Sequence, residues 1–142
     1  MRGAAVDCAP LFLSLYAARR TLYPDCMDRP LLDREAIDRL LGFGGSKLVR
    51  GMVELFVTNA PMKAAEAREA LDCGDAGALR AALHGLKSSA GQLGATTVHQ
   101  ACIAGEELAS RGDLEACGAY VARVEADLPQ ACRELQAIAS AA

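Results

Sequence analysis

Apolar residues repeat at three- and four-residue intervals along most of this chain, and a glycine followed by an aspartate interrupts the repeat twice, at Gly74-Asp75 and Gly112-Asp113. Glycine accepts the left-handed conformation that ends many helices, and aspartate accepts hydrogen bonds from the free N–H groups that begin the next helix. No alternating strand pattern or hairpin signal appears in the sequence. The spacing therefore predicts an all-α fold.

The repeats predict one short helix followed by four long ones. Asp33 caps the short helix, which ends in the glycine-rich stretch 42–45. The first long helix begins near Ser46. Pro61 is expected to kink or break it near Asn59, because proline removes a backbone hydrogen bond.

Short turns separate the remaining long helices. Gly94 ends the second long helix, and Thr96 or Ala95 begins the third. The fourth keeps the alternating three-four spacing of a bundle seam, and Pro129 predicts a bend in it. Short turns between long amphipathic helices favour an antiparallel up-down four-helix bundle, with the short first helix covering one end.

Length and composition limit the possible classes of protein. The 142 residues are enough for one domain, and the net charge of −3 provides no basic surface for nucleic acid. Six cysteines occur without any Cys-x-x-Cys pair, so the spacing of a zinc site is absent. Three of them fall on apolar helical positions, which indicates buried thiols in a reducing cytosol. We expect a cytoplasmic monomer that binds neither nucleic acid nor membrane.

Residues 1–26 differ from the rest of the chain. Their apolar run, Leu11 to Ala18, is too short to span a membrane and lacks the flanks of a signal peptide. We interpret them as a poorly ordered or loosely docked N-terminal extension, or as the product of an upstream start, and we place the helical domain at residues 27–142. An amphipathic helix docked on the domain is the alternative interpretation.

The stretch from Leu79 to Gly94 carries the candidate chemistry. Its apolar stripe leaves His84 and Lys87 as neighbours on the wetter flank, since they lie three residues apart on one helix. Ser88 and Gly91 follow on the same side, and their small size leaves room for a large partner. A neutral imidazole nitrogen is a good nucleophile near neutral pH and leaves readily once phosphorylated. A His-x-x-Lys pair alone is a weak signal, because most such pairs are simply solvated.

These residues resemble the motif of histidine phosphotransfer (HPt) domains, the phosphocarriers of bacterial phosphorelays. That motif is His-x-Leu-Lys-Gly-Ser/Ala with a glycine five residues later, and the matching positions here are His84, Leu86, Lys87, Ser89 and Gly94. Ser88 departs from it, since the family usually has glycine there. The resemblance covers roughly residues 31–138 and includes the Cys102 and Glu106 positions of the next helix.

The resemblance implies that His84 accepts and donates a phosphoryl group, relaying it between receiver-domain aspartates of response regulators or hybrid kinases. Glu106 is expected to accept the Nδ1 proton of His84 from the adjacent helix, and Lys87 to offset the charge that arrives on His84. The chain shows no ATP-binding glycine loop and no acidic cluster for Mg²⁺. We therefore expect a carrier, not an enzyme, without a cofactor of its own; the partner receiver would supply the Mg²⁺.

We expect the docking surface for that partner to surround His84. Its other members are Lys87, Arg80, Ser88 and Gly91, with His99 and Ile103 from the next helix. His99 itself lacks a lysine three residues on, and we interpret it as a surface histidine. Two other functions remain open. One is a bundle that only docks receivers, and the other is a metal-binding bundle that uses His84, His99, Cys102 and Glu106.

Overall fold

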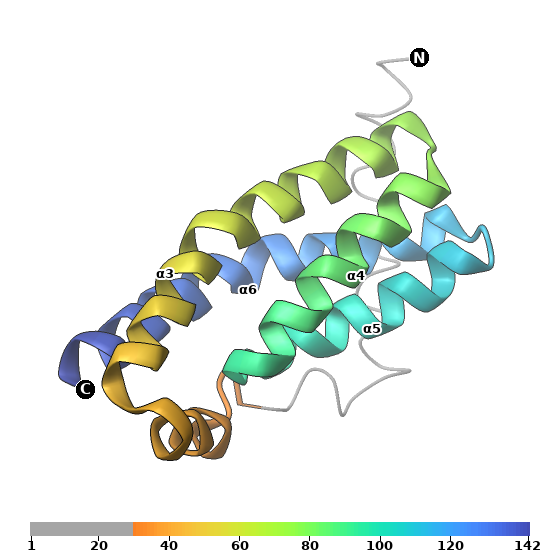
Figure 1. Cartoon of the computed structure of the whole chain (residues 1–142). Helices are drawn as coiled ribbons and strands as arrows, with labels where there is room; N and C mark the ends of the chain where they lie inside the picture. The colour runs from red at the N-terminus through yellow and green to blue at the C-terminus, as the bar shows by residue number, and fades with distance from the viewer. Residues whose placement is uncertain (1–29) are drawn as a thin grey trace.

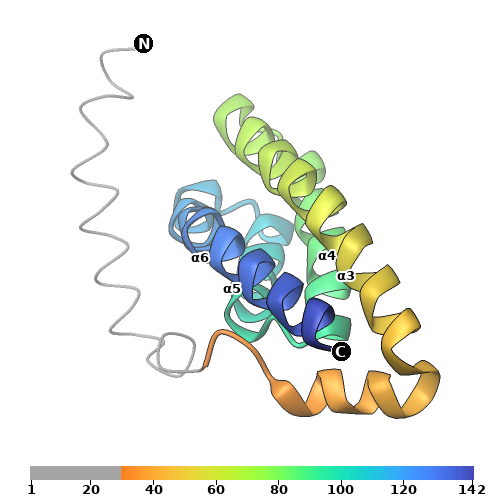
Figure 2. The same ribbon diagram turned by 90° about the vertical axis from the view of Figure 1, so that its left-hand side faces the viewer.

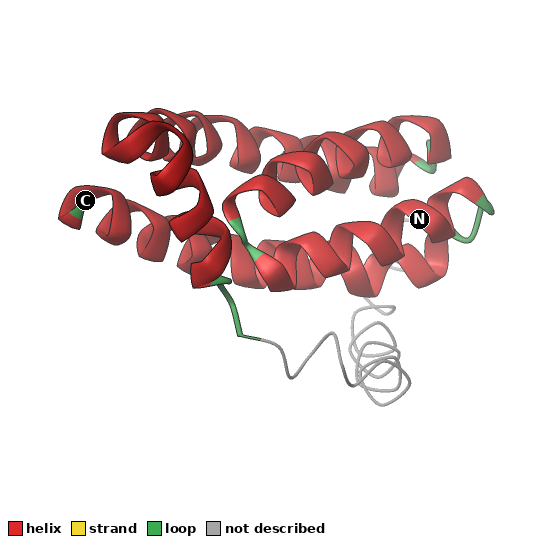
Figure 3. Ribbon diagram, turned by 60° about the horizontal axis from the view of Figure 1, so that its bottom comes forward, coloured by secondary structure: helices red, strands yellow, loops and turns green. Residues whose placement is uncertain are grey.

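A computed structural model describes residues 30–142 and contains four α-helices joined by short turns (Figure 1). The helices are α3 (Arg34–Cys73), α4 (Ala76–Leu93), α5 (Thr96–Ser110) and α6 (Leu114–Ala141). Every regular element of this described part is a helix, as Figure 3 shows. The predicted N-terminal extension at 1–26 lies outside the described residues.

The four helices pack in a ring. α4 lies between α3 and α5, and α6 closes the ring against α5 and α3. Successive helices run in opposite directions, because the turns between them are tight (Figures 1 and 2). Side chains from all four helices fill the centre, among them Phe56, Leu83, Val98 and Leu135. The predicted antiparallel four-helix bundle is confirmed.

The turns follow the predicted punctuation. Asp75 Oδ1 accepts a hydrogen bond from Ala78 N at 3.0 Å, and Asp33 and Asp113 cap α3 and α6 in a similar way. Gly94 follows α4 with a φ of 73°, a left-handed conformation that glycine adopts without a steric penalty. Local sequence signals therefore determine where these helices begin and end.

α3 changes direction at Gly45, which has a φ of 72° and a ψ of −169° inside an otherwise helical run. The part of α3 before this residue crosses one end of the bundle (Figure 2). It buries Ile37, which is 1% exposed, in the core. This part corresponds to the short first helix that the sequence predicts.

The segment leading into α3 is fastened to the α4–α5 turn by backbone hydrogen bonds. Asp33 N donates to Gly94 O at 2.7 Å, and Thr96 N donates to Leu31 O at 3.0 Å. A Cβ at Gly94 would lie 2.6 Å from Asp33 O, so this close approach requires glycine. One end of the bundle is closed by these contacts.

The prolines within α3 and α6 do not end these helices. α3 continues through Pro61 in helical geometry, and α6 continues through Pro129. The sequence predicts a kink or a break near Asn59, and of these two the break does not occur. Proline removes one backbone hydrogen bond, but buried side chains on both sides of Pro61, including Phe56 and Ala64, hold the helix against the core.

Side-chain burial follows the predicted apolar stripes. Cys102, Cys117 and Cys132 are buried, as their apolar positions predict, whereas Cys73 is exposed. Within the described part of the chain, none of the helices combines the length and the hydrophobicity needed to cross a membrane.

Candidate functional site

His84 lies on the outward side of α4, next to the apolar stripe. Its neighbours Leu83 and Leu86 are buried, whereas 63% of the His84 side chain is exposed. Each residue of a helix is rotated by about 100° from the one before it, so the buried stripe fixes the direction in which the imidazole points. The flank of α4 that carries His84 borders α5.

Glu106 on α5 contacts the imidazole. Its Oε1 lies 3.0 Å from His84 Nδ1. An ionised carboxylate can only accept hydrogen bonds, so His84 Nδ1 carries the proton and donates it to this bond. The second ring nitrogen, Nε2, is then left with its lone pair on the far side of the ring. The contact therefore leaves Nε2 as the ring nitrogen with a free lone pair, which is the form of imidazole that can act as a nucleophile.

Lys87 meets the other oxygen of the same carboxylate. Its Nζ lies 2.7 Å from Glu106 Oε2, an oxygen shielded from water. The side chains of Lys87 and Glu106 are 27% and 14% exposed, so this ion pair is largely removed from solvent. The sequence predicts that Lys87 offsets the charge that arrives on His84. In this structure, the side chains of Lys87 and His84 both contact the carboxylate of Glu106.

Opposing effects act on the pKa of Glu106. Partial burial raises it, while the hydrogen bonds and charges of Lys87 and His84 lower it by more, so the pKa lies below its ordinary value. The carboxylate is therefore ionised at neutral pH, as its acceptor role requires. The nearby Cys102 behaves differently, since burial first and Glu106 second raise the pKa of its thiol to about 12. Cys102 stays a neutral thiol at this pH.

Glu107 differs from Glu106 in both exposure and partner. Its side chain is 60% exposed, and its Oε1 accepts a hydrogen bond from Arg111 Nη2 at 2.6 Å, one turn further along α5. One step along a helix rotates a side chain by about 100°, which is enough to turn Glu107 toward solvent. The two neighbouring glutamates therefore form a natural pair for comparison.

A shallow hollow lies beside the imidazole. It has a volume of about 310 Å³ and is lined by Gly77, Arg80, Ala81, His84 and Glu106. Arg80 is exposed one turn before His84 and brings a positive charge to this hollow. Ser88, one turn after His84, is also exposed, and its Oγ donates to the main-chain oxygen of His84 at 3.3 Å. The Ser88 hydroxyl is therefore engaged by its own helix.

His99 does not occupy the surface position predicted for it. It is half-buried, and its Nδ1 lies 2.9 Å from the main-chain oxygen of Lys87. Its ring covers Gly91, where a Cβ would lie 2.8 Å from His99 Cε1. A large residue at position 91 would therefore disturb the α4–α5 contact as well as any partner. Ile103, which lies between His99 and Glu106 on α5, is 38% exposed.

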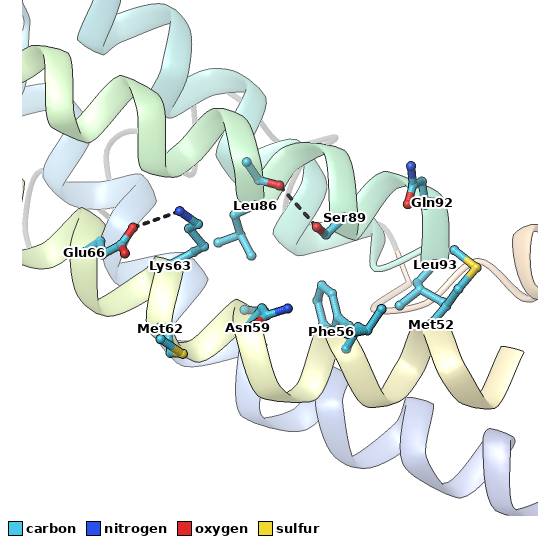
Figure 4. A pocket seen from close by; sticks show the side chains of 13 residues that line it. Met52, Phe56, Asn59, Met62, Lys63, Glu66, Leu86, Ser89, Gln92 and Leu93 are labelled. Atoms are coloured by element: carbon cyan, nitrogen blue, oxygen red, sulfur yellow. Dashed lines mark hydrogen bonds and ion pairs between the residues drawn. The ribbon is translucent and has the colours of Figure 1, made fainter. Parts of the chain in front are cut away.

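A groove that the sequence analysis did not identify lies on the opposite flank of α4, between α4 and α3 (Figure 4). Its volume is about 420 Å³, and its walls include Phe56 and Met62 of α3 and Gly85 and Ser89 of α4. Leu55 and Met62, seven residues apart, are 64% and 60% exposed. The seven-residue spacing of Leu55 and Met62 is visible in the sequence. However, Leu55 also belongs to the broad apolar face of this helix, which predicts that it is buried in the core. Gly85, the residue after His84, lines the groove, whereas His84 itself does not.

The residues proposed for a metal site do not converge. His84 and Glu106 touch, but His99 bonds to the carbonyl of Lys87. Within residues 30–142, no group of three His, Cys, Asp or Glu side chains is arranged so that it could hold a metal ion.

Two comparisons with known proteins found similarity. The sequence pattern of the Hpt domain family matches residues 51–140. The fold resembles the crystal structure of histidine-containing phosphotransfer protein B (HptB) from Pseudomonas aeruginosa PAO1, with a TM-score of 0.74 and 23% sequence identity. The similarity covers 81% of this chain and 99% of that one, and at this identity it concerns the fold. No protein with a curated description matches the chain.

Proposed function

Because the chain belongs to the Hpt domain family, the histidine phosphotransfer proteins of phosphorelays, we propose that His84 is the residue that accepts and donates the phosphoryl group. An Hpt domain is a phosphotransfer domain and not a kinase with its own ATP site. The observation that carries the assignment is the contact between His84 Nδ1 and Glu106 Oε1 at 3.0 Å, which leaves Nε2 with a free lone pair on a side chain that is 63% exposed.

The proposed step is a direct displacement at phosphorus. His84 Nε2 attacks the phosphoryl group of a receiver's aspartyl phosphate, so that a P–N bond forms while the P–O bond to the aspartate breaks and its electron pair returns to the carboxylate. The imidazole keeps its proton on Nδ1 and becomes positively charged. Glu106, already in contact with Nδ1, faces that charge. The reverse displacement by another aspartate passes the group on.

Lys87 and Arg80 supply positive charge around this step. Phosphoryl transfer depends mainly on alignment and on stabilisation of negative charge. Lys87 is held on Glu106 in the resting protein, where it orients that carboxylate. When His84 carries a phosphoryl group, the Lys87 ammonium would turn toward it. Arg80 lines the hollow beside His84. Each of these contacts is partly exposed, so each tunes the step by a modest amount.

Hpt domains interact with receiver domains or kinases in phosphorelays. For this chain we propose a receiver as the partner, bringing both the aspartate and the Mg²⁺ that its chemistry needs. The receiver would cover the exposed face of His84. It would contact Arg80, Ser88 and Ile103 on one flank and the exposed Leu55 and Met62 of the α3–α4 groove on the other. Such an encounter is transient, and we propose that the carrier works as a monomer in the cytoplasm.

The test is phosphotransfer from phosphorylated receiver domains, followed by mapping of the modified residue. We expect an acid-labile, base-stable label on His84, as a phosphoramidate requires, and none in the His84→Gln protein. His84→Gln should stay folded because the side chain is 63% exposed. The chain contains two histidines, so the map must separate His84 from His99. A label that persists in folded His84→Gln protein would refute the assignment.

A further inference from the structure

The α4–α5 interface contains a polar contact that the phosphotransfer step does not use. His99 of α5 sits in a helix interface, half-buried, with its Nδ1 2.9 Å from the main-chain oxygen of Lys87 on α4. A carbonyl oxygen can only accept a hydrogen bond, so Nδ1 carries a proton and donates it. A side chain on α5 is thereby bonded directly to the backbone of α4, at the residue whose side chain reaches Glu106.

Glycine makes this contact possible. The His99 ring lies over Gly91, where a Cβ would be 3.0 Å from Nδ1 and 2.8 Å from Cε1, and real Cβ atoms essentially never show the second distance. A second glycine has the reciprocal arrangement on α5. A Cβ at Gly105 would lie 2.9 Å from Leu83 Cδ1 of α4. Each helix therefore places a bulky side chain over a glycine of the other, which fixes how closely and in what register they pack.

These two contacts lie close to the functional pair along both helices. Leu83 and Gly105 immediately precede His84 and Glu106 in sequence. His99 lies two turns before Glu106 on α5, and Gly91 lies two turns after His84 on antiparallel α4. At about 1.5 Å per residue, both separations are roughly 10 Å. The His84–Glu106 contact and the Gly91–His99 contact are therefore in the same register of the two helices. A slip of α5 along α4 would break the His99 bond and the Glu106 contact together.

We propose that His99 is a positioning residue: by bonding the Lys87 carbonyl over Gly91, it sets the register of α4 and α5 that brings Glu106 to His84 Nδ1. It touches neither the phosphoryl group nor the attacking nitrogen. The inference rests on the proposed role of His84 and adds to it a residue remote from the reacting atoms.

The test compares His99→Leu, which keeps bulk but removes the donor, with His99→Asn, whose side-chain amide can donate from nearly the position of Nδ1. We expect His99→Leu to slow phosphotransfer by up to about tenfold, the weight of one hydrogen bond, and His99→Asn to recover most of the rate. Nitrogen NMR of the His84 ring is the second readout. His99→Leu should move the His84 proton from Nδ1 toward Nε2, and His99→Asn should restore the wild-type signals.

Controls separate positioning from a general loss of stability. Val124→Ala removes buried volume from α6, which packs mainly against α3 and α5, and it serves as the control for a comparable loss of melting temperature. It should leave the His84 ring signals unchanged. If His99→Leu fails to fold, Gly91→Ala provides the second route, because its Cβ displaces the His99 ring. Gly91→Ala should move the same ring signals in the same direction.

Three outcomes would overturn the proposal. One is a folded His99→Leu protein with wild-type rate and wild-type His84 ring signals. Another is equal slowing by His99→Leu and His99→Asn, which would show that the hydrogen bond is not what matters. The third is a folded Gly91→Ala protein without any change at His84. The ring signals do not depend on labelling, so failure of the wild-type protein to accept phosphate would refute the proposed function while this comparison still decides the role of His99.

Discussion

Replacing Glu106 with alanine removes the two contacts of its carboxylate at once, the hydrogen bond with His84 Nδ1 and the ion pair with Lys87. We expect the Glu106→Ala protein to fold, to be less stable than the wild type and to accept phosphoryl groups more slowly. The two losses have different sources and can be sized separately.

The loss of stability comes mainly from the Lys87 ion pair. Exposed ion pairs contribute about 0–1 kcal/mol, whereas removing one partner of a buried pair costs about 3–5 kcal/mol. This pair lies between those limits, with side chains 27% and 14% exposed, and the released Lys87 ammonium can turn toward water. We therefore expect the free energy of unfolding to fall by about 1–2 kcal/mol.

The loss of rate comes from the His84 contact. A hydrogen bond to a charged group contributes about 1.5–3 kcal/mol when it is shielded. His84 is 63% exposed, so water replaces part of that bond, and about 1 kcal/mol remains. Since about 1.4 kcal/mol corresponds to a tenfold change in rate, we expect transfer to slow by about fivefold.

Single-turnover transfer from a phosphorylated receiver measures the rate, and urea unfolding measures the stability. Glu107→Ala is the matched control, because its side chain is 60% exposed and pairs with Arg111. It should behave as wild type in both assays. Glu106→Gln keeps an oxygen that can accept the His84 proton but loses the charge that Lys87 needs, so it should retain more of the rate than Glu106→Ala. Equal slowing by the two alanine variants would show that the carboxylate of Glu106 has no special role.

Further expectations concern the turns, a thiol and pH. Gly94→Ala should lower the free energy of unfolding by about 1–3 kcal/mol, seen in the melting temperature, because the new Cβ would meet Asp33 O at 2.6 Å and φ is 73°; an unchanged melting temperature would contradict this. The Cys102 thiol, with a pKa raised to about 12, should resist alkylation at pH 8 while exposed Cys73 reacts, as peptide mapping can establish. Because folding lowers the pKa of Glu106, its stabilising effect is present above its ordinary pKa of 4.5 and is lost as pH falls through the lowered pKa. Urea unfolding between pH 6 and pH 3 should therefore show an acid-side loss of stability that is smaller in Glu106→Ala.

Local signals were sufficient to predict most of the architecture. Helix caps such as Asp75 and left-handed glycines such as Gly94 act within a few residues of themselves, so they can be recognised in the sequence. The three- and four-residue apolar spacing likewise specifies which side of a helix is buried. What it cannot specify is the strength of the surrounding packing. For that reason α3 does not break near Asn59, one of the two outcomes predicted from Pro61, since buried neighbours outweigh one lost hydrogen bond.

The site was less predictable where it depends on how two helices meet. His84 and Lys87 are neighbours on one helix and are recognisable from their spacing. The position of His99 over Gly91 depends on the register of α5 against α4, which no local pattern specifies. The α3–α4 groove has the same origin, because the exposure of Leu55 is determined by where α4 lies beside α3.

The backbone ties between the start of α3 and the α4–α5 turn have a practical consequence for anyone cloning this domain. The family pattern begins at residue 51, beyond both the Asp33–Gly94 and the Leu31–Thr96 hydrogen bonds. A gene fragment trimmed to that boundary would remove Ile37 from the core. It would also leave the C-terminal end of α4 and the N-terminal end of α5 uncovered. The smallest soluble fragment should therefore be sought with start sites upstream of Leu31, since the limit of recognisable similarity lies inside the cooperative folding unit.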